Sequence, residues 1–564
     1  MREFFLKVRN FFLPPQDTQT WLKLLPYGLL GIFTLILLTA GAYGWEYTNS
    51  PEFCGQSCHT MPPEYTAYLS SPHARIDCVD CHIGKGFIAT RITRKAGDIK
   101  HVTKTIFKDY EFPIRAHDLR PARETCELCH FPEKFSDDSL REIKRFKSDF
   151  ENTPLSTYLT LKTGGGSKRA GLGRGIHWHI ENPVYYFASD PEEQQIPYVK
   201  IVDEDGNITE YIDTEAVFNL SDVQESELVE MDCITCHNRI THLVPSPEDT
   251  IDQLLASGAI SRDIPEIRSK SLGAYSEVFN STQMGLNNIE GLVGYYQTYH
   301  PDYFQDNQDK IAEAVEALKN AYATSVFPQQ NSDWTTHPNN IGHKDSPGCF
   351  RCHDGKHLNA EKEAIRLECN LCHSIPVVAG PYDFVADIEI SRGPEPQSHL
   401  NENWISMHHQ VYDETCQNCH TTANPGGTDN SSFCSNSACH GTEWVYAGFD
   451  APGLRDILVS QLPPTPTPAP IPSGGPLTFT DTIGPILGSR CSGCHGTEGI
   501  QGLNLTDYQS ILTGGESGPA VVPGDPGASL IVIKNSQELP HFGQLSTEEL
   551  DLIVQWITGG APEN

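Results

Sequence analysis

Cysteine and histidine occur in this chain in a repeated pattern that can bind a redox cofactor. All 18 cysteines fall into pairs, and a histidine directly follows the second cysteine of every pair. Seven pairs have the spacing C-x-x-C-H, and two are stretched by one or two residues. Such thiols can form thioethers to the two vinyl groups of one haem while the adjacent histidine binds its iron. The nine motifs are Cys54/Cys58/His59, Cys78/Cys81/His82, Cys126/Cys129/His130, Cys233/Cys236/His237, Cys349/Cys352/His353, Cys369/Cys372/His373, Cys416/Cys419/His420, Cys434/Cys439/His440 and Cys491/Cys494/His495.

Disulfides, structural zinc and redox-active C-x-x-C pairs are the competing interpretations of these cysteines. Disulfides do not require a histidine after the second cysteine. Zinc sites use paired cysteines but do not explain the same third residue in every motif. Histidine makes up only 23 of the 564 residues, so nine coincidences are not credible. The sequence therefore predicts nine covalently attached haem c groups, and this attachment places the residues after 50 outside the cytoplasm.

The histidines outside the motifs are candidate ligands for the sixth position of each iron. There are 14 of them, enough for every haem, and five lie close in sequence to the fifth to eighth motifs. A chain that saturates its irons in this way carries electrons and has no open site for a substrate. The five are His343, His357, His399, His408 and His409.

Charge and length limit the partners and the domain organisation. The chain has 40 Lys and Arg against 73 Asp and Glu, a formal charge of −33. Nucleic acid is excluded as a partner, because phosphate binding needs clustered positive charge. The 46 Gly and 40 Pro indicate a loop-rich chain, and the length predicts roughly three to five domains.

One segment near the N-terminus is apolar enough to cross a membrane. Residues 24–45 form a run of 22 residues without a charge, and about 20 residues span the hydrocarbon core. Four basic residues precede the run, so the positive-inside rule predicts a cytoplasmic N-terminus. The sequence Ala40-Gly41-Ala42 allows a cleaved signal peptide as the alternative.

The remaining chain divides by its haem motifs and its composition. Residues 198–202 and 208–212 are predicted as two strands around a turn, and residues 309–318 have helical periodicity. A proline-rich stretch precedes the last motif and is typical of an extended linker. The predicted domains are an anchor at 1–47, a four-haem domain at 48–247, a haem-free helical segment at 248–336, a second four-haem region at 337–457, a linker at 458–476 and a monohaem domain at 477–564.

Residues 20–245 resemble the NapC/NirT family of membrane-anchored tetrahaem quinol dehydrogenases. The resemblance is carried by the anchor followed by residues 52–61, by Ser71-Pro72-His73 ahead of the second motif, and by His242 five residues after His237. The family usually has two residues between its first two cysteines, whereas this chain has three. Residues 337–440 resemble the additional haem region of larger inner-membrane multihaem cytochromes, and the last 90 residues or so resemble a monohaem cytochrome c.

The family resemblance implies further iron ligands. Met61 would be an axial ligand of the first haem, with simple packing as the alternative. His73 and His242 would serve haems of the four-haem domain, and the pair His177 and His179 would supply a third ligand. In the C-terminal domain no Met follows residue 407. His541 is therefore the expected ligand there, with an open or water-bound iron as the alternative.

The resemblance also implies a quinol site beside the first haem. A cationic segment, residues 91–101, follows the second motif. In NapC/NirT relatives a basic residue and an aspartate from this region lie next to the first haem. Lys95 and Asp98 match that pattern best, with Arg91 and His101 as substitutes. The alternative is that these cations contact only lipid headgroups.

The sequence as a whole predicts a membrane-anchored nonahaem cytochrome c, mostly α-helix and loop, with one transmembrane helix. Its haems would form much of the core, and a small α-helical cytochrome c domain would end the chain. We expect it to sit in the lipid bilayer of the cytoplasmic membrane, oxidise membrane quinol and reduce an extracytoplasmic redox partner protein, with its haem domains periplasmic or at the cell surface. The alternatives are a terminal reductase with one open haem and a relay subunit without a quinol site.

Overall fold

The computed structural model divides into two compact units that interleave in sequence. The anchor unit comprises residues 1–131 and 232–340, and the sheet unit comprises 132–231 and 341–564. Each unit is described by itself. The structure describes residues 2–13, 18–97, 99–116, 119–131, 138–164, 175–203, 205–367, 371–381, 404–408, 420–449, 454, 457, 477–497, 502–515, 517–536 and 545–564. The predicted linker at 458–476 lies outside them.

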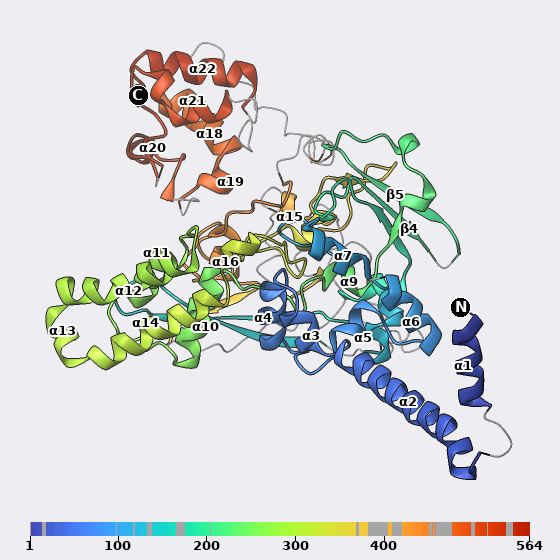
Figure 1. The fold of residues 1–564 in the computed structure, drawn as a ribbon. Coiled ribbons are helices and arrows are strands. Elements are labelled where there is room, and N and C mark those ends of the chain that lie inside the picture. Colours follow the sequence, from blue (N-terminus) through green and yellow to red (C-terminus); the bar gives the residue numbers. More distant parts are fainter. Residues whose placement is uncertain are drawn as a thin grey trace. The chain divides into compact units, whose positions relative to one another are not determined.

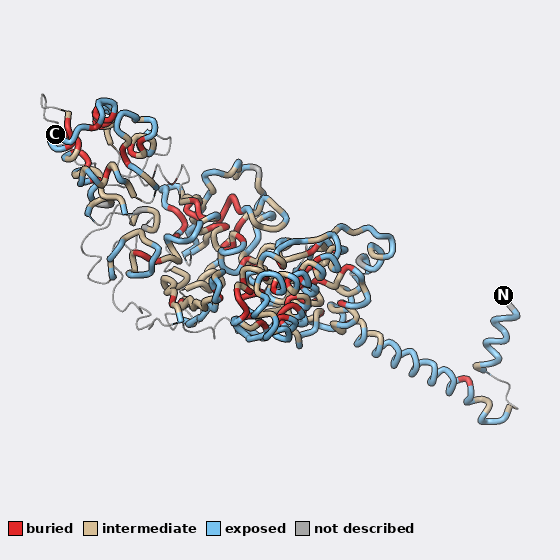
Figure 2. The backbone as a smooth tube through the Cα atoms, turned by 90° about the vertical axis from the view of Figure 1, so that its left-hand side faces the viewer, coloured by how far each residue is buried: buried red, intermediate tan, exposed pale blue. Residues whose placement is uncertain are grey.

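The anchor unit begins with a long apolar helix. Helix α2, Thr20–Tyr47, has 28 residues, contains the predicted apolar run and is long and apolar enough to cross a membrane. At 1.5 Å per residue it is about 42 Å long. Figure 2 shows it exposed along nearly its whole length, as expected of a helix whose apolar side chains face lipid. A short helix, α1 (Arg2–Phe12), precedes it.

Short helices around the haem motifs and a bundle of longer helices complete the anchor unit (Figure 1). In the bundle, α12 and α14 pack side by side over a core that includes Ile289, Tyr296 and Leu318. Helix α14 contains the predicted helix at 309–318, so that prediction is confirmed. The helices are α3 (Pro51–Gln56), α4 (Pro62–Ser70), α5 (Cys78–His82), α6 (Ile88–Gly97), α7 (Ile99–Phe107), α9 (Cys233–Cys236), α10 (Pro247–Ser257), α11 (Ile267–Tyr275), α12 (Thr282–Tyr299), α13 (Pro301–Asp306) and α14 (Gln308–Ala323).

The sheet unit contains two antiparallel sheets. One has the strand order β1-β2-β8 and the other β6-β3-β4-β5-β7. The predicted strand pair is confirmed as β4 and β5, in which Val199 pairs with Tyr211. The hairpin of β1 and β2 was not predicted. The strands are β1 (Ser139–Phe146), β2 (Pro154–Leu161), β3 (Val184–Phe187), β4 (Tyr198–Val202), β5 (Ile208–Asp213), β6 (Val229–Glu230), β7 (His357–Leu358) and β8 (Val377–Ala379).

The described parts of residues 477–564 are mostly helical and have a hydrophobic core of their own. Ile483, Leu487 and Trp556 are buried in it. The predicted final helix is α22, and Ser546 caps it by accepting a hydrogen bond from the backbone N–H of Glu549. Among the described residues of the sheet unit, the helices are α8 (Trp178–Glu181), α15 (Trp404–Met407), α16 (Ser437–His440), α18 (Gly484–Arg490), α19 (Ser492–His495), α20 (Tyr508–Thr513), α21 (Leu530–Asn535) and α22 (Thr547–Thr558).

Candidate haem sites and electron entry site

Five of the regular haem motifs lie in short helical turns, at residues 78–82, 126–130, 233–237, 349–353 and 491–495. In four of them the histidine N–H donates to the carbonyl of the first cysteine, four residues earlier. An i to i+4 spacing puts two side chains on the same face of a helix. The turn therefore directs the first thiol and the imidazole toward one bound group. The N···O distances are 2.8 Å for His130 and Cys126, 2.8 Å for His237 and Cys233, 3.0 Å for His353 and Cys349 and 2.8 Å for His495 and Cys491.

The second cysteines of the regular motifs lie in unequal surroundings, although their spacing is the same. Cys129 is exposed, whereas Cys352 is buried in a hydrophobic cluster that includes Tyr186. Cys372 is half-buried, and its carbonyl accepts from the backbone N–H of Lys162 at 2.8 Å, directly after β2. The spacing predicted one role for all three and did not indicate this difference, because tertiary packing sets the burial. Haem attachment through Cys129, Cys352 and Cys372 stays a prediction.

The two stretched motifs accommodate their extra residues by breaking the helix. Cys54 lies in α3, but Cys58 follows the end of that helix, and its carbonyl accepts from the N–H of Met61 at 3.2 Å. Cys434 lies in a separate 3₁₀ turn (Phe433–Ser435) before α16, which holds Cys439. Both stretched motifs thus keep the second cysteine directly beside its histidine.

Among the described residues, five motif histidines face a histidine from elsewhere in the chain. Metal–imidazole bonds are about 2 Å long, so two axial imidazoles on one iron have ring centroids about 6 Å apart. The five pairs match that separation, and each combines one motif histidine with one predicted distal ligand. They therefore fit iron ligation from both sides. The centroid distances are 6.3 Å for His82 and His242, 6.0 Å for His130 and His73, 5.8 Å for His353 and His179, 6.3 Å for His373 and His343 and 6.3 Å for His440 and His408.

Backbone carbonyls orient most of these rings. The Nδ1–H of a metal-binding histidine usually donates to a carbonyl or carboxylate, which leaves Nε2 for the metal. His179 donates to the carbonyl of Ile176 at 2.9 Å, and His408 donates to that of Ile405 at 2.6 Å. The Nδ1 atoms of His353 and His373 lie 2.5 and 2.6 Å from the carbonyls of Arg366 and Ser374.

His357 lies in a different environment. Its Nδ1 is 2.9 Å from Asp354 Oδ1, and its Nε2 is 2.6 Å from the carbonyl of Ile196. Burial lowers the pKa of His357, but the Asp354 carboxylate outweighs it and raises this pKa above the usual value. Both ring nitrogens thus face acceptors within the protein, and the ligand set that we propose omits His357.

Several predicted site residues are not placed in such pairs. Met61 is the N-cap of α4 and His177 is the N-cap of α8. His59 hydrogen-bonds the Tyr110 hydroxyl, and His420 stacks on Phe433 at 4.0 Å. Their roles, like those of the predicted residues outside the described part, stay predictions. The predicted residues outside the described part are Asp98, Cys369, His399, His409, Cys416, Cys419 and His541, together with the side chains of His101 and Cys494.

Lys95 lies at the C-terminal end of the apolar helix. From α6, its ammonium donates to Thr48 Oγ1 at 2.8 Å and to Asn49 Oδ1 at 2.5 Å. It also lies 5.0 Å from the centre of the Trp45 ring, and Arg91 lies 5.9 Å from the same ring. One residue, the N-cap Ser50, separates Asn49 from α3, which holds Cys54. The geometry therefore puts this cation between the apolar helix and the first haem motif.

Comparison with known proteins gives the family. The chain is 37% identical over 396 residues to cytochrome c-type protein ImcH of Geobacter sulfurreducens, a match that covers 70% of this chain and 76% of that protein. Residues 16–121 match the N-terminal region of the NapC/NirT cytochrome c family. The chain belongs to the NapC/NirT family of membrane-anchored multihaem cytochromes c. This confirms the resemblance inferred from the motifs.

Other similarities cover shorter parts of this NapC/NirT cytochrome. It is 29% identical over 105 residues to cytochrome c-type protein NrfH of Wolinella succinogenes, which covers 18% of this chain and 58% of NrfH. Residues 491–538 match the family described as Planctomycete cytochrome C. No solved structure matches the chain.

Sequence reasoning missed a buried acidic group beside the ligands of the NapC/NirT-like part. Glu64 is 3.0 Å from His242 Nδ1, 3.4 Å from an Arg239 amino group and 3.9 Å from His337 Nε2. Burial raises the pKa of Glu64. The hydrogen bond from His242 and the charge of Arg239 together lower this pKa by more than burial raises it, so it is about 2. The only signal in the sequence is that Glu64 lies three residues after Met61.

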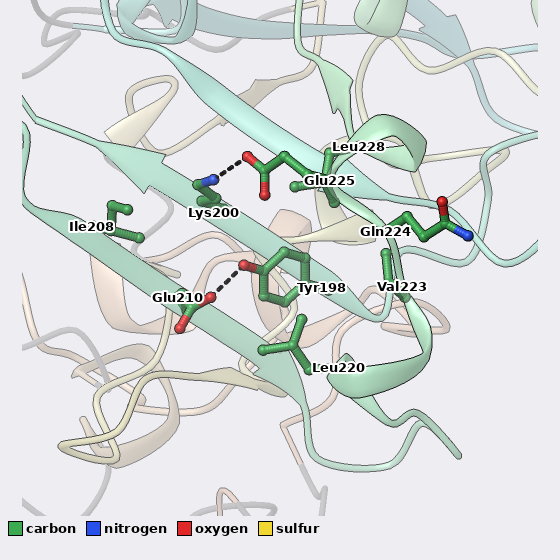
Figure 3. A pocket seen from close by; sticks show the side chains of 9 residues that line it. All are labelled: Tyr198, Lys200, Ile208, Glu210, Leu220, Val223, Gln224, Glu225 and Leu228. Carbon is green, nitrogen blue, oxygen red and sulfur yellow. Dashed lines mark hydrogen bonds and ion pairs between the residues drawn. The ribbon is translucent and has the colours of Figure 1, made fainter.

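The cavity in Figure 3 belongs to the sheet unit. It has a volume of about 460 Å³ and opens on β4 and β5, where Tyr198 donates to Glu210 at 2.5 Å and Lys200 pairs with Glu225 at 2.6 Å. None of its lining residues is a predicted site residue.

Proposed function

We propose that this cytochrome oxidises membrane quinol beside Lys95 and passes the electrons to an extracytoplasmic redox protein. The position of Lys95 carries the proposal: its ammonium is held between Trp45, near the end of α2, and the turn before Cys54. A cation there can hold a quinol oxygen and favour loss of its proton. Asp98 is proposed as the proton acceptor, and Arg91 and His101 as supporting residues.

Nine covalent haems are proposed, one for each motif. Haem supplies one-electron redox chemistry, which divides the two-electron oxidation of quinol into single transfers. The chain's residues attach and orient the groups: cysteine pairs hold them, and the paired histidine rings bind the iron from both sides. Met61 is the proposed ligand at the first haem. His177, His399 and His409 are the proposed candidates for the distal ligands of the fourth and seventh haems. His541 is the proposed distal ligand of the ninth haem.

The haem-bearing residues are proposed to lie outside the cytoplasm, with α1 inside. Basic residues precede α2, and the positive-inside rule supports this orientation. The domain boundaries given above are proposed with it, including a monohaem domain at 477–564 tethered by residues 458–476. The core of Ile483, Leu487 and Trp556 supports independent folding of that domain.

The quinol site is tested by Lys95→Ala and by the double variant with Asp98→Ala. Hydrogen bonds to charged groups are worth roughly 1.5–3 kcal/mol, so reduction by a quinol analogue should slow at least about tenfold. Reduction by dithionite should be unchanged. Lys104→Ala is the matched control, because Lys104 is an exposed lysine in the neighbouring helix α7. Reduction of the double variant by quinol at the wild-type rate would show that the site is elsewhere.

The same preparation separates the two other functions. A terminal reductase with one open haem would give a high-spin signal in the oxidised spectrum of the full protein. A relay subunit would be fully reducible by dithionite but not by quinol in membranes. Quinol-driven reduction without a high-spin signal is the result expected for the proposed function.

A further inference from the structure

The five histidine pairs differ in what lies behind the distal ring. His179 and His408 each donate Nδ1–H to a carbonyl three residues earlier. His242 instead lies 3.0 Å from the Glu64 carboxylate, and 3.1 Å from the Glu64 carbonyl. The other Nδ1 partners described above for the paired histidines are backbone carbonyls, whereas Glu64 offers a side-chain carboxylate. The pair of His82 with His242 therefore has an anion behind its distal ring.

The carboxylate is fixed in place by its surroundings. Glu64 is 9% exposed, so water screens its charge weakly. Arg239 lies 3.4 and 3.5 Å from its two oxygens, and also donates to the carbonyl of His242. Arg239 thus fixes Glu64 and the His242 backbone together while offsetting part of the negative charge.

A carboxylate behind a metal-bound imidazole makes that ligand more basic. A more basic ligand stabilises the ferric form relative to the ferrous form and lowers the reduction potential. We propose that Glu64 is a positioning residue that orients His242 and lowers the reduction potential of the haem carried by Cys78, Cys81 and His82. This inference rests on the proposed ligation by His242.

The test is a spectroelectrochemical titration of the full purified protein. Glu64→Gln should move one haem transition to higher potential, and Arg239→Gln should move a transition to lower potential, since it leaves the carboxylate unopposed. Both variants should keep the wild-type haem content. Opposite shifts are the decisive feature, because a purely structural disturbance would not depend on the sign of the removed charge. Shifts in the same direction, or none, would overturn the inference.

Two further variants separate the possible failures. Asp252→Asn is the matched control, because Asp252 is a buried acid paired with Arg268 at 2.7 Å in the haem-free helices. It should leave every transition in place. His242→Ala should turn one low-spin haem high-spin in the EPR spectrum. If it does not, the proposed ligation is wrong. If it does while Glu64→Gln shifts nothing, only the role of Glu64 is wrong.

A second, independent observation concerns α1. Five of its six apolar side chains recur at positions i, i+1, i+4, i+7 and i+8, which form one face of a helix, whereas Leu6 falls on the other side. Three of them are strongly exposed: Phe4 at 66%, Phe5 at 65% and Phe11 at 46%. The fourth apolar position is Val8, also exposed, and the last is Phe12.

Phe12 connects this face to the membrane-spanning helix. Its ring packs edge-on against Tyr27 at 6.2 Å, and its carbonyl accepts from the Tyr27 hydroxyl at 2.9 Å. Tyr27 lies in the first turns of α2, where the apolar run begins. By helical geometry, Lys7 and Arg9 fall on either side of the apolar face. Side chains of this kind reach from an interfacial helix to anionic headgroups.

We infer that α1 lies in the membrane surface and binds an anionic lipid leaflet through this face. The full-length protein in nanodiscs with and without phosphatidylglycerol provides the test, read by hydrogen exchange of the α1 amides. Phe11→Glu should lose protection in anionic nanodiscs. Asn10→Glu adds the same charge on the polar face and should retain most of it. Equal protection in the two variants, or equal protection in neutral and anionic nanodiscs, would overturn the inference.

Discussion

The haem-free helices α10–α14 and the motif-bearing residues 48–131 belong to the same unit, yet they are built differently. The helices bury a conventional core, in which Ile251, Ile289 and Leu318 are fully buried. In residues 48–131 the described helices have at most ten residues, and the buried apolar side chains are few and scattered: Ala67, Tyr68, Val79, Ile83 and Ala122. Burial of apolar area is the main stabilising term in folding. We infer that covalent haem supplies the missing apolar surface in the motif-bearing part.

Removing the haem should give the largest contrast between these two regions. When the chain is produced without covalent haem attachment, the amides of α12 and α14 should remain protected from hydrogen exchange. Those of α4, α5 and α6 should exchange freely, because their core would be absent. The haem-loaded protein is the control, with both regions protected. Protection of residues 48–131 in the haem-free chain would show that this region folds on its own residues and would contradict the comparison.

The same contrast explains which features the sequence could predict. Local patterns were sufficient for α14 and for β4 with β5, because each depends on residues close in sequence. The hairpin of β1 and β2 was missed because Arg141, Glu142 and Lys144 give β1 the pattern of a polar segment, and its sheet is completed by distant β8.

The ring pairs depend on contacts that a sequence does not specify. Sequence distance would assign His343 to the motif at 349–353, but its ring lies beside that of His373. His179 pairs with His353 across 174 positions. The role of Glu64 was not predicted for the same reason, because its partners Arg239 and His242 are distant from it in the sequence. Such partners are set by tertiary packing rather than by spacing.

A core substitution in helices α10–α14 should have the next largest effect, on the stability of those helices. Leu318 in α14 is fully buried, and Leu318→Ala should destabilise the helices by about 2–5 kcal/mol, the usual cost of such a cavity. Leu243→Ala is the control, because Leu243 is 43% exposed, and surface changes usually cost less than about 0.5 kcal/mol. Hydrogen exchange of the α12 and α14 amides under denaturant measures both. Equal costs at the two positions would show that these helices do not depend on their own core.

The smallest effect should come from the helix caps. Ser246 caps α10 by accepting from the N–H of Asp249 at 3.3 Å, and Pro247 follows it. Ser246→Ala should therefore cost about 1 kcal/mol in the stability of α10. Asp77 occupies the same position before α5, but its side chain makes no capping hydrogen bond. In the haem-loaded protein, Asp77→Ala should lower the protection of the α5 amides much less, because thioether bonds and ligation hold that turn. A larger loss from Asp77→Ala than from Ser246→Ala would show that α5 depends on its own helical ends.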